Sequence, residues 1–587
     1  MLLGIGVALA AGLGSRSRLL GLPVRLKLRP ARYRRLWPAV FLIAAALVIL
    51  GAAIHPPNNI DAVTYRLPRV MHWLASGQWH WIDTVDPRQN YSGCGQEWLM
   101  APLIALTGTD RLTWIWNAVA WLLLPGLLFS MLRDFGVRGR TAWTWMWLLP
   151  LAPVYLLQAG STANDLLGAA YFVAAMAFAG QARKNSSCEP LAYSILAIGL
   201  ATGVKASNLP LVLPWLMMAV PAIASKAGCL KVWLAGLFAV AVSALPTLAA
   251  NRACTGTWTG DPSNVTAVQA GRPWSGLIGN TLQCGIQNLQ PPVFPWAEQV
   301  EGWARAGLEP AVRRCLRCDF PRFTTHLTEL AQEEWAGLGG LVVLLLLGAW
   351  VWPRRRPAPL PAEAERSCRP MVFAGGGVAC LAFFAVMGSE MTARLLAPYY
   401  PLAVAAALVG CRPAWWVGMA VFRTLAIVAI LGSAVALGLS PARPLFPVPW
   451  ILKMLAPMDK PAPEVVSRAR VLYGVYAERS DPLAALRAHL PAGVRLVGFM
   501  ASPDDSEISF WMPFGKRRVE TVRPSDAGSL LRGRGISWMV ARSDVVWPDG
   551  AGKEQWLRGH SATVVEERAV LVKARKKPED WLLVRID

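Results

Sequence analysis

Charged side chains are scarce in this sequence. Asp, Glu, Lys and Arg together make up 16% of the 587 residues, whereas 54% of the residues are hydrophobic. Soluble globular proteins carry about 25% charged residues. The scarcity therefore excludes a simple soluble enzyme and predicts a polytopic membrane protein.

Familiar catalytic motifs are lacking as well. The chain has no GxSxG, HExxH or Walker motif, no DNA-reading motif and no internal repeat. The net charge of +22 does not indicate nucleic acid, because the arginines lie in short tracts between apolar segments, as membrane-topology signals do. We therefore expect the lipid bilayer, and no nucleic acid, as a partner.

Apolar segments of about bilayer length are abundant. They cover residues 37–54, 112–132, 143–158, 165–181, 191–204, 209–225, 232–249, 338–352, 371–388, 395–411 and 416–439. Together they predict about eleven transmembrane helices.

The short basic loops between these segments test the order of the crossings. If the basic block 25–35 is cytoplasmic, every later basic loop falls on the same side. These loops contain Arg133, Arg138, Arg140, Arg183, Lys184, Lys226, Lys231, Arg354–Arg356, Arg366, Arg369 and Arg412. This topology places loops 56–111 and 250–336 and the C-terminus outside the membrane.

The composition becomes that of a soluble protein from about Pro461. We predict a membrane domain over residues 1–440 and a small α/β periplasmic domain over residues 441–587. Within the latter, periodicity predicts a helix over 481–490 and strands over 494–500, 535–541, 569–573 and 581–586. The domain has no Gly-rich phosphate loop, which favours an accessory role over catalysis.

The first outer loop concentrates polar groups. If it is helical after Ile60, then Asp61, Tyr65 and Arg69 recur every four residues and share one face, with Arg66 close by. A carboxylate beside guanidinium groups suits a site that deprotonates a hydroxyl and binds a phosphate. The alternative is an interfacial amphipathic helix whose charges only face water.

Four more charged residues lie at the outer ends of apolar segments, and each has a structural alternative. Glu97 could complement a helix dipole, and Asp165 lies among N-cap residues. Lys205 could extend its amine to the interface, and Arg394 could pair with Glu390. Ionisable groups so close to hydrocarbon are nevertheless functional candidates.

Half of the ten cysteines fall outside the membrane in this topology. They are Cys94, Cys254, Cys284, Cys315 and Cys318. Cysteines outside the cytoplasm tend to form disulfides, so we expect one or two here, with open connectivity. The single CxxC is a weak zinc motif because no second pair follows at finger spacing.

The polar motifs together resemble those of a known superfamily. They are IDAVTYRLPRVMHWLASGQ, DPRQNYSGCGQEWLMAPL, GTDRL, LLQAGSTANDLL, GLATGVKASNLPLVLP and MTARLLAPYYP, in this order along the chain. They are similar to the loops of GT-C membrane glycosyltransferases, in the protein O-mannosyltransferase-like group that includes lipid A aminoarabinose transferases. One departure is that Asp61 is followed by Ala62, where several relatives have an acidic pair.

The resemblance implies a role for each candidate. Asp61 corresponds to the general base and Asp165 to a second active-site acid. Lys205, Arg69 and Arg394 correspond to donor-phosphate ligands. Tyr65 and Arg66 would contact substrate, and Glu97 corresponds to an acid that binds a divalent metal in some members. The cofactor would thus be a divalent metal ion or none.

The implied protein is an inverting transferase of the bacterial inner membrane, with a cytoplasmic N-terminus. It would move a sugar from a polyprenyl-phosphate donor to an envelope acceptor on the periplasmic face. The alternatives are a transporter or flippase of lipid-linked glycans and a non-catalytic membrane scaffold. The missing repeat and the outer position of the polar residues argue against transport.

Overall fold

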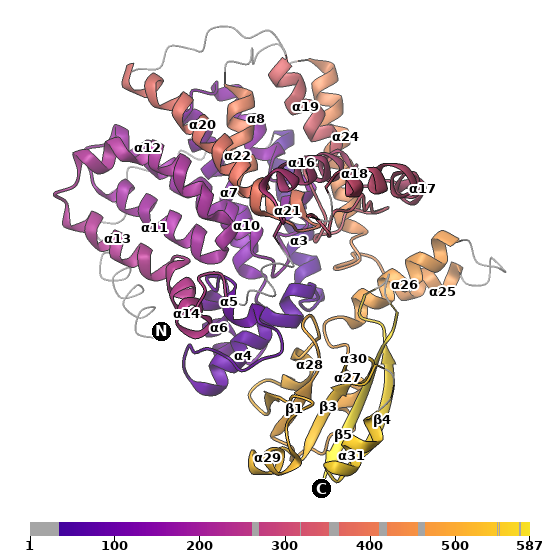
Figure 1. The fold of residues 1–587 in the computed structure, drawn as a ribbon. Coiled ribbons are helices and arrows are strands. Elements are labelled where there is room, and N and C mark those ends of the chain that lie inside the picture. Colours follow the sequence, from indigo (N-terminus) through magenta and orange to yellow (C-terminus); the bar gives the residue numbers. More distant parts are fainter. Residues whose placement is uncertain are drawn as a thin grey trace.

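Long apolar helices dominate the chain up to residue 455, and a small sheet forms its C-terminal part (Figure 1). The computed structural model describes residues 35–260, 269–316, 319–351, 363–409, 419–455, 464–548, 550, 552–573 and 577–587. The basic stretches 25–34 and 354–356, Arg412 and Cys318 lie outside the described residues.

Every apolar segment identified in the sequence is largely helical in the structure. The elements are α3 (Leu36–Ile54), α7 (Ile115–Asp134), α8 (Gly139–Leu148), α9 (Pro153–Leu156), α10 (Asp165–Lys184), α11 (Glu189–Val204), η3 (Ala206–Leu211), α12 (Val212–Ser225), α13 (Leu230–Val242), α14 (Leu245–Thr255), α19 (Gly340–Val351), α20 (Glu363–Val386), α21 (Thr392–Leu395), α22 (Tyr400–Leu408) and α24 (Ala420–Gly438).

The number of spans is smaller when judged by helix length. Among the described residues, six helices are long and apolar enough to cross a bilayer, or seven if α13 and α14, bent by 44°, form one span. The predicted segment 143–158 is divided between α8 and α9, with Pro153 starting the second helix. Proline lacks the amide proton that a helix interior needs, so it favours such breaks. The structure thus shows a multi-pass protein without establishing eleven crossings.

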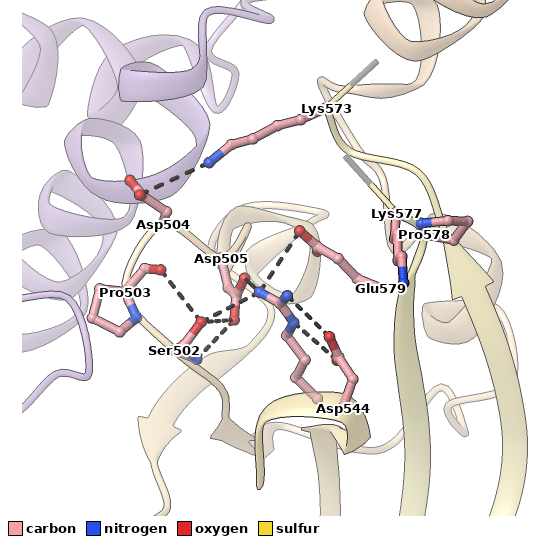
Figure 2. Close-up of a pocket in the computed structure, with 10 residues that line it drawn as sticks. Ser502, Pro503, Asp504, Asp505, Asp544, Lys573, Lys577, Pro578 and Glu579 are labelled. Atoms are coloured by element: carbon pink, nitrogen blue, oxygen red, sulfur yellow. Dashed lines mark hydrogen bonds and ion pairs between the residues drawn. The ribbon is translucent and has the colours of Figure 1, made fainter. Parts of the chain in front are cut away.

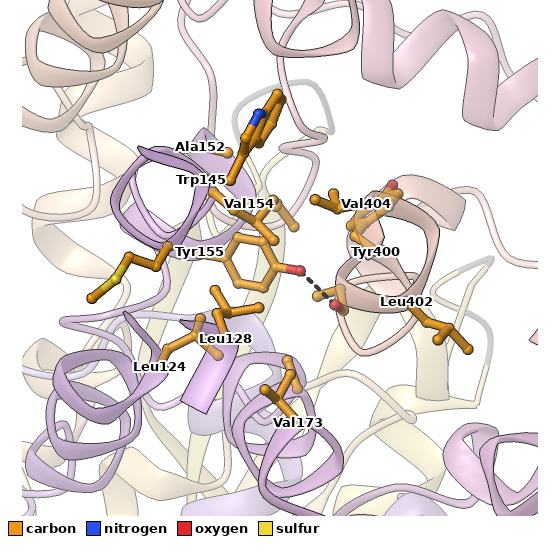
Figure 3. Close-up of a cluster of buried hydrophobic side chains, with 14 of the residues drawn as sticks. Leu124, Leu128, Trp145, Ala152, Val154, Tyr155, Val173, Tyr400, Leu402 and Val404 are labelled. Atoms are coloured by element: carbon orange, nitrogen blue, oxygen red, sulfur yellow. Dashed lines mark hydrogen bonds between the residues drawn. The ribbon is translucent and has the colours of Figure 1, made fainter. Parts of the chain in front are cut away.

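Helix α10 lies at the centre of the helical bundle. In the 18-residue stretch of α10 with the highest hydropathy, 78% of the residues are buried, against 22% for the corresponding stretch of α20. Figure 3 shows part of the surrounding core, where Leu124, Val173 and Tyr400 lie around Tyr155. The Tyr155 hydroxyl donates a hydrogen bond of 2.7 Å to the carbonyl of Ala397. Because a buried hydroxyl needs a partner, this bond fixes α9 against the turn before α22.

The second outer region carries short helices, as its length predicted. They are α16 (Pro273–Leu289), α17 (Ala297–Trp303), η4 (Ala304–Leu308) and α18 (Glu309–Cys315). Residues 319–338 then return to the bundle without a regular helix, and this return segment buries Glu333 and Glu334.

The C-terminal part is α/β, as predicted. After α25 (Val448–Leu455) and α26 (Glu464–Glu478), five strands form one sheet in the order β2-β1-β3-β5-β4. Strand β1 (Leu496–Met500) runs parallel to β2 (Arg518–Thr521) and to β3 (Trp538–Arg542). Strands β4 (Ala562–Val570) and β5 (Glu579–Ile586) complete the sheet in antiparallel pairing.

Three local predictions in this part were incomplete. The helix expected over 481–490 is reduced to α27 (Ala484–Arg487), and strand β4 begins seven residues before the predicted start at Ala569. Strand β2 was missed because its four residues, RVET, are too few and too polar to show alternation. Its parallel ladder with β1 forms it instead.

The sheet packs directly against the first outer loop. In one hydrophobic cluster Leu67 and Met71 of α4 (Leu67–Ser76) lie with Phe510 and Trp511 of α28 (Ile508–Trp511). Between the two parts, Nε2 of His72 lies within hydrogen-bond distance of the Glu507 carboxylate, at 2.8 Å. Figure 1 shows the sheet beside α4 and α6 (Glu97–Thr107), at one end of the helical bundle.

The expected disulfides are absent from the part of the chain that the structure describes. Cys94, Cys254, Cys284 and Cys315 are all free. The Cys94 sulfur lies 3.3 Å from the Thr247 hydroxyl and not near another thiol. The predicted position outside the membrane was therefore insufficient to predict pairing of the cysteines that the structure describes.

Candidate active site

The first outer loop begins with a π-helical turn, η2 (Ala62–Arg66), before α4. A π turn takes about one residue more than an α turn, so it shifts the phase of the helix. The predicted common face of Asp61, Tyr65 and Arg69 is therefore wrong. Asp61 and Tyr65 remain at the site described below, whereas Arg69 contacts the far end of the loop.

Four of the predicted residues form one chain of alternating charge. The Asp61 carboxylate lies 3.6 Å from Nη2 of Arg394, and Nε of Arg394 lies 3.3 Å from the Asp165 carboxylate. The second Asp165 oxygen accepts a hydrogen bond of 2.6 Å from Nζ of Lys205. We call Asp61, Arg394, Asp165 and Lys205 the outer charge chain.

The members of the outer charge chain come from four separate segments. Asp61 immediately precedes η2, Asp165 is the first residue of α10, Lys205 joins α11 to η3, and Arg394 belongs to α21. The centre is buried, while the side chains of Asp61 and Lys205 stay 19% and 23% exposed. The two ends are thus accessible to a ligand.

The contacts decide against two of the structural alternatives. Arg394 pairs with Asp61 and Asp165, whereas none of the ion pairs formed by the described residues joins it to Glu390. Lys205 pairs with Asp165 and does not merely extend toward an interface. Both cations are therefore parts of one polar site.

Arg88 is a site residue that the sequence did not single out. Its Nη1 lies 4.0 Å from Asp61, and its Nη2 lies 2.5 Å from both Asp86 and Asp504. The guanidinium also covers the Tyr65 ring, 4.6 Å from its centroid. The DPR sequence placed Arg88 near Asp86, but nothing in the spacing indicated Asp61 or the C-terminal part.

The local electrostatics keep Asp61 ionised. Burial by itself raises the pKa of the Asp61 carboxyl. Nearby positive charges lower it, and in falling order of effect they belong to Arg394, Arg66, Arg88 and Lys205. The charges outweigh burial, so the pKa lies below its ordinary value. At neutral pH this carboxylate is ionised and can accept a hydrogen bond, and its lowered pKa makes it a weaker base than an ordinary aspartate.

Arg69 does not contribute to a phosphate site, which corrects the prediction. Its Nε donates to the carbonyl of Gln89 at 2.6 Å, and its Nη2 donates to Arg88 and Ser92. Its Nη1 reaches the carbonyl of Gly93 at 3.4 Å. The guanidinium is completely buried and already saturated, so it stabilises the loop.

Glu97 contacts protein partners through one oxygen, Oε1, while its Oε2 makes no hydrogen bond to a described residue. Its carboxylate lies 3.5 Å from Arg66 and 3.6 Å from Arg69, in a fully buried position. Two guanidinium groups already compensate its charge, and the described residues include no cluster of three His, Cys, Asp or Glu that could hold a metal. The surroundings of Glu97 therefore do not fit a divalent cation.

Tyr65 and Arg66 connect these two networks. Nη2 of Arg66 donates a hydrogen bond of 2.9 Å to the Tyr65 hydroxyl, and Nη1 donates one of 3.2 Å to Gln96. Burial raises the pKa of Tyr65, so the phenol stays protonated. Substrate contact by Tyr65 and Arg66 remains a prediction.

A further buried network, missed in the sequence, holds the start of the loop. Glu333 accepts hydrogen bonds from Asn59 at 2.6 Å and from Ser161 at 2.9 Å, and it also pairs with Arg443. The adjacent Glu334 pairs with Arg479 at 3.2 Å. These contacts join five distant segments and position Asp61.

Comparisons with known proteins return only distant structural likenesses. No family model and no curated protein matches the chain. A crystal structure of ArnT from Cupriavidus metallidurans bound to undecaprenyl phosphate is 14% identical, with a TM-score of 0.45, and the alignment covers 93% of this chain and 98% of that one. The apo state of the same protein gives 15% identity, 93% and 97% coverage and a TM-score of 0.46.

An oligosaccharyltransferase from Archaeoglobus fulgidus in the apo form is also similar. It is 13% identical over 87% of this chain and 70% of that chain, with a TM-score of 0.39. At these identities and TM-scores the likeness is distant, and the chemistry of the site rests on its own residues.

Proposed function

We propose that this protein is a membrane glycosyltransferase that moves a sugar from a polyprenyl-phosphate donor to an envelope acceptor. The observation that carries the proposal is the outer charge chain. Its four members lie in motifs that resemble GT-C loops, and the fold brings them together from four segments. Assignment to the periplasmic face of a bacterial inner membrane belongs to the same proposal.

Asp61 acts as the general base in this reaction. Its carboxylate accepts the proton of an acceptor hydroxyl while the hydroxyl oxygen attacks the anomeric carbon of the donor. The new glycosidic C–O bond forms as the bond from that carbon to the phosphate oxygen breaks. Direct displacement of this kind inverts the anomeric configuration.

Arg394 and Lys205 stabilise the departing lipid phosphate. They lie against Asp61 and Asp165, and Nε of Arg394 makes no hydrogen bond to any described residue. A phosphate oxygen can use this unsatisfied donor. Charge-assisted bonds to the leaving group strengthen as its negative charge develops.

The same geometry disfavours transport of a lipid-linked glycan. Transporters place their substrate sites near the membrane midplane, between repeated halves. Here the charged residues lie at the first residue of α10 and in the connections before η2 and η3. A site at helix ends is better suited to a reaction at the membrane surface.

The decisive experiment is a transfer assay with the purified protein. Radiolabelled polyprenyl-phosphate sugars and envelope extracts are supplied with and without a chelator, and label on a lipid, glycan or protein identifies the acceptor. Asp61→Asn should lower the rate by about 10²- to 10⁴-fold, the usual contribution of a general base. Asp83→Asn, which alters an exposed acid of the same loop, is the matched control.

Two outcomes would overturn the proposal. One is wild-type turnover by the Asp61→Asn protein. The other is movement of intact labelled donor across vesicles without appearance of any new glycoside, which would establish the transporter.

A further inference from the structure

One cavity lined by described residues lies outside the outer charge chain. Its volume is about 430 Å³, and it is lined by Ser502–Asp505, by Arg542 and Asp544, and by Lys573 and Lys577–Glu579. Cavities of about 300–1,000 Å³ are typical of sites for small organic groups. Figure 2 shows these side chains converging from three connections of the C-terminal sheet.

The cavity occupies a position that the strand order makes special. Strand β1 lies between β2 and β3, so the chain leaves β1 to one side and later returns to the other. In such parallel sheets, ligands bind beyond the carboxyl ends of the strands, where the winding reverses. Residues 502–505 follow β1, and Arg542 and Asp544 lie at the end of β3, so the cavity lies at this reversal.

The floor of the cavity is acidic. Arg542 lies 2.5 Å from Asp505, 3.1 Å from Asp544 and 3.6 Å from Glu579. One guanidinium faces three carboxyl groups, so the floor is rich in hydrogen-bond acceptors, and burial raises the pKa of Asp505 and of Glu579. Carboxylates in this arrangement accept hydrogen bonds from hydroxyl groups.

The rim carries the opposite charge. Lys573 lies 3.8 Å from Asp504, and no described residue forms an ion pair with Lys577. A ligand that satisfies both surfaces has several hydroxyl groups at one end and an anionic group at the other. Because lysine binds phosphate well as a point charge, a phosphate is suited to the rim.

The cavity is also connected to the outer charge chain. Asp504, which belongs to its wall, pairs with Arg88 at 2.5 Å, and Arg88 lies 4.0 Å from Asp61. In Figure 2 the helices of the first loop lie beside Asp504. A ligand in the cavity is thus one arginine away from the proposed base.

We propose that this cavity binds a phosphorylated saccharide, with the sugar hydroxyls on the Asp505–Asp544–Glu579 floor and the phosphate at Lys573 and Lys577. That this saccharide is the headgroup of the acceptor rests on the proposed function. The C-terminal part would then select the acceptor and hold it next to Asp61.

Equilibrium dialysis on the full-length protein in lipid nanodiscs tests the binding. The probes are radiolabelled glucose 6-phosphate, glucose and inorganic phosphate. We expect the phosphorylated sugar to bind about tenfold more tightly than either of the others, since it engages both surfaces. Lys577→Ala should remove this advantage, and Lys553→Ala, which alters a lysine paired with Glu567 elsewhere on the sheet, should keep it.

The two proposals fail in different ways. Equal binding of the three probes, or an unchanged affinity in Lys577→Ala, overturns the saccharide site even if sugar transfer is observed. Binding that persists in Asp61→Asn supports the site independently of catalysis. In the transfer assay, Lys577→Ala should raise the KM for the acceptor about tenfold and leave kcat and the KM for the donor unchanged; a lower kcat alone would exclude acceptor binding.

Discussion

Arg69 and Arg394 carry the same charge in equally buried positions, yet their surroundings are opposite. Arg69 donates hydrogen bonds to four backbone carbonyls, and every nitrogen of its guanidinium is used. Arg394 faces two carboxylates at 3.3 and 3.6 Å, and its Nε makes no hydrogen bond to a described residue. The protein satisfies every guanidinium nitrogen of Arg69, whereas Arg394 keeps one donor without an acceptor among the described residues.

The difference separates scaffold from site. A buried donor without a partner costs roughly 1–3 kcal/mol, so an acceptor that reaches Nε of Arg394 would bind favourably there. The backbone carbonyls are permanent partners of Arg69. A phosphate, by contrast, can replace a carboxylate as the partner of Arg394. Four tests address this contrast.

Arg394→Ala should give the largest effect. Loss of one preorganised donor to a developing anion lowers the rate by about 10²- to 10³-fold. The chain should still fold, because Asp165 keeps its ion pair with Lys205 and Asp61 keeps its contact with Arg88. Transfer rate and thermal unfolding are measured together, with Arg272→Ala, which alters an exposed arginine paired with Asp319, as the control. Full activity would make Arg394 a scaffold residue.

Arg69→Ala should act on stability instead. Removing this partner leaves the carbonyls and Glu97 unsatisfied in a buried place, at a cost of about 3–5 kcal/mol. We expect a lower unfolding midpoint and less folded protein, with near-normal turnover per folded molecule. Arg518→Ala, which removes an exposed donor to the Ala75 carbonyl, is the control. Lost turnover at unchanged stability would contradict the contrast.

The pH dependence should follow Asp61. Its pKa is lower in the folded protein than in the unfolded chain, so the ionised form stabilises the fold at neutral pH. This stabilisation, and the base, are lost as pH falls through the folded-state pKa. Activity should therefore persist below the ordinary range of an aspartate.

Arg88→Gln should move this acid limb to higher pH, because it removes one of the charges that lower the pKa. Arg523→Gln, at the same contact between the first loop and the sheet, should leave the limb unchanged. The measurement is the pH profile of kcat/KM. An identical profile in both variants would mean that Arg88 does not lower the pKa that controls activity.

Asp83→Asn should produce the smallest change. Its ion pair of 2.5 Å with Arg523 is more than half exposed, and such pairs contribute about 1 kcal/mol or less. Unfolding in urea should show a midpoint close to that of the wild type. A large loss would mean that the exposed pair, and not the shared hydrophobic cluster, holds the sheet to the loop.

The sequence predicted the helical segments well because hydrophobic length is a local property. It also predicted Asp61, Asp165, Lys205 and Arg394 as one set, because they lie in motifs that resemble GT-C loops and follow one another in the same order. It could not assign Arg69 or Glu97 correctly, because their partners are backbone carbonyls and each other's side chains. Arg88 escaped notice for a related reason, since its partner Asp504 lies more than 400 positions away.

By itself the sequence determined that this chain is a polytopic membrane protein with an α/β C-terminal part and polar residues at the ends of its helices. Those properties follow from composition and periodicity, which are local to one helical turn or one strand. The tertiary structure alone decided which charges meet. The π turn rotates Arg69 away from Asp61, the return segment brings Glu333 to Asn59, and the strand order opens a cavity beside Arg88. Each depends on contacts between distant segments, which no local pattern encodes.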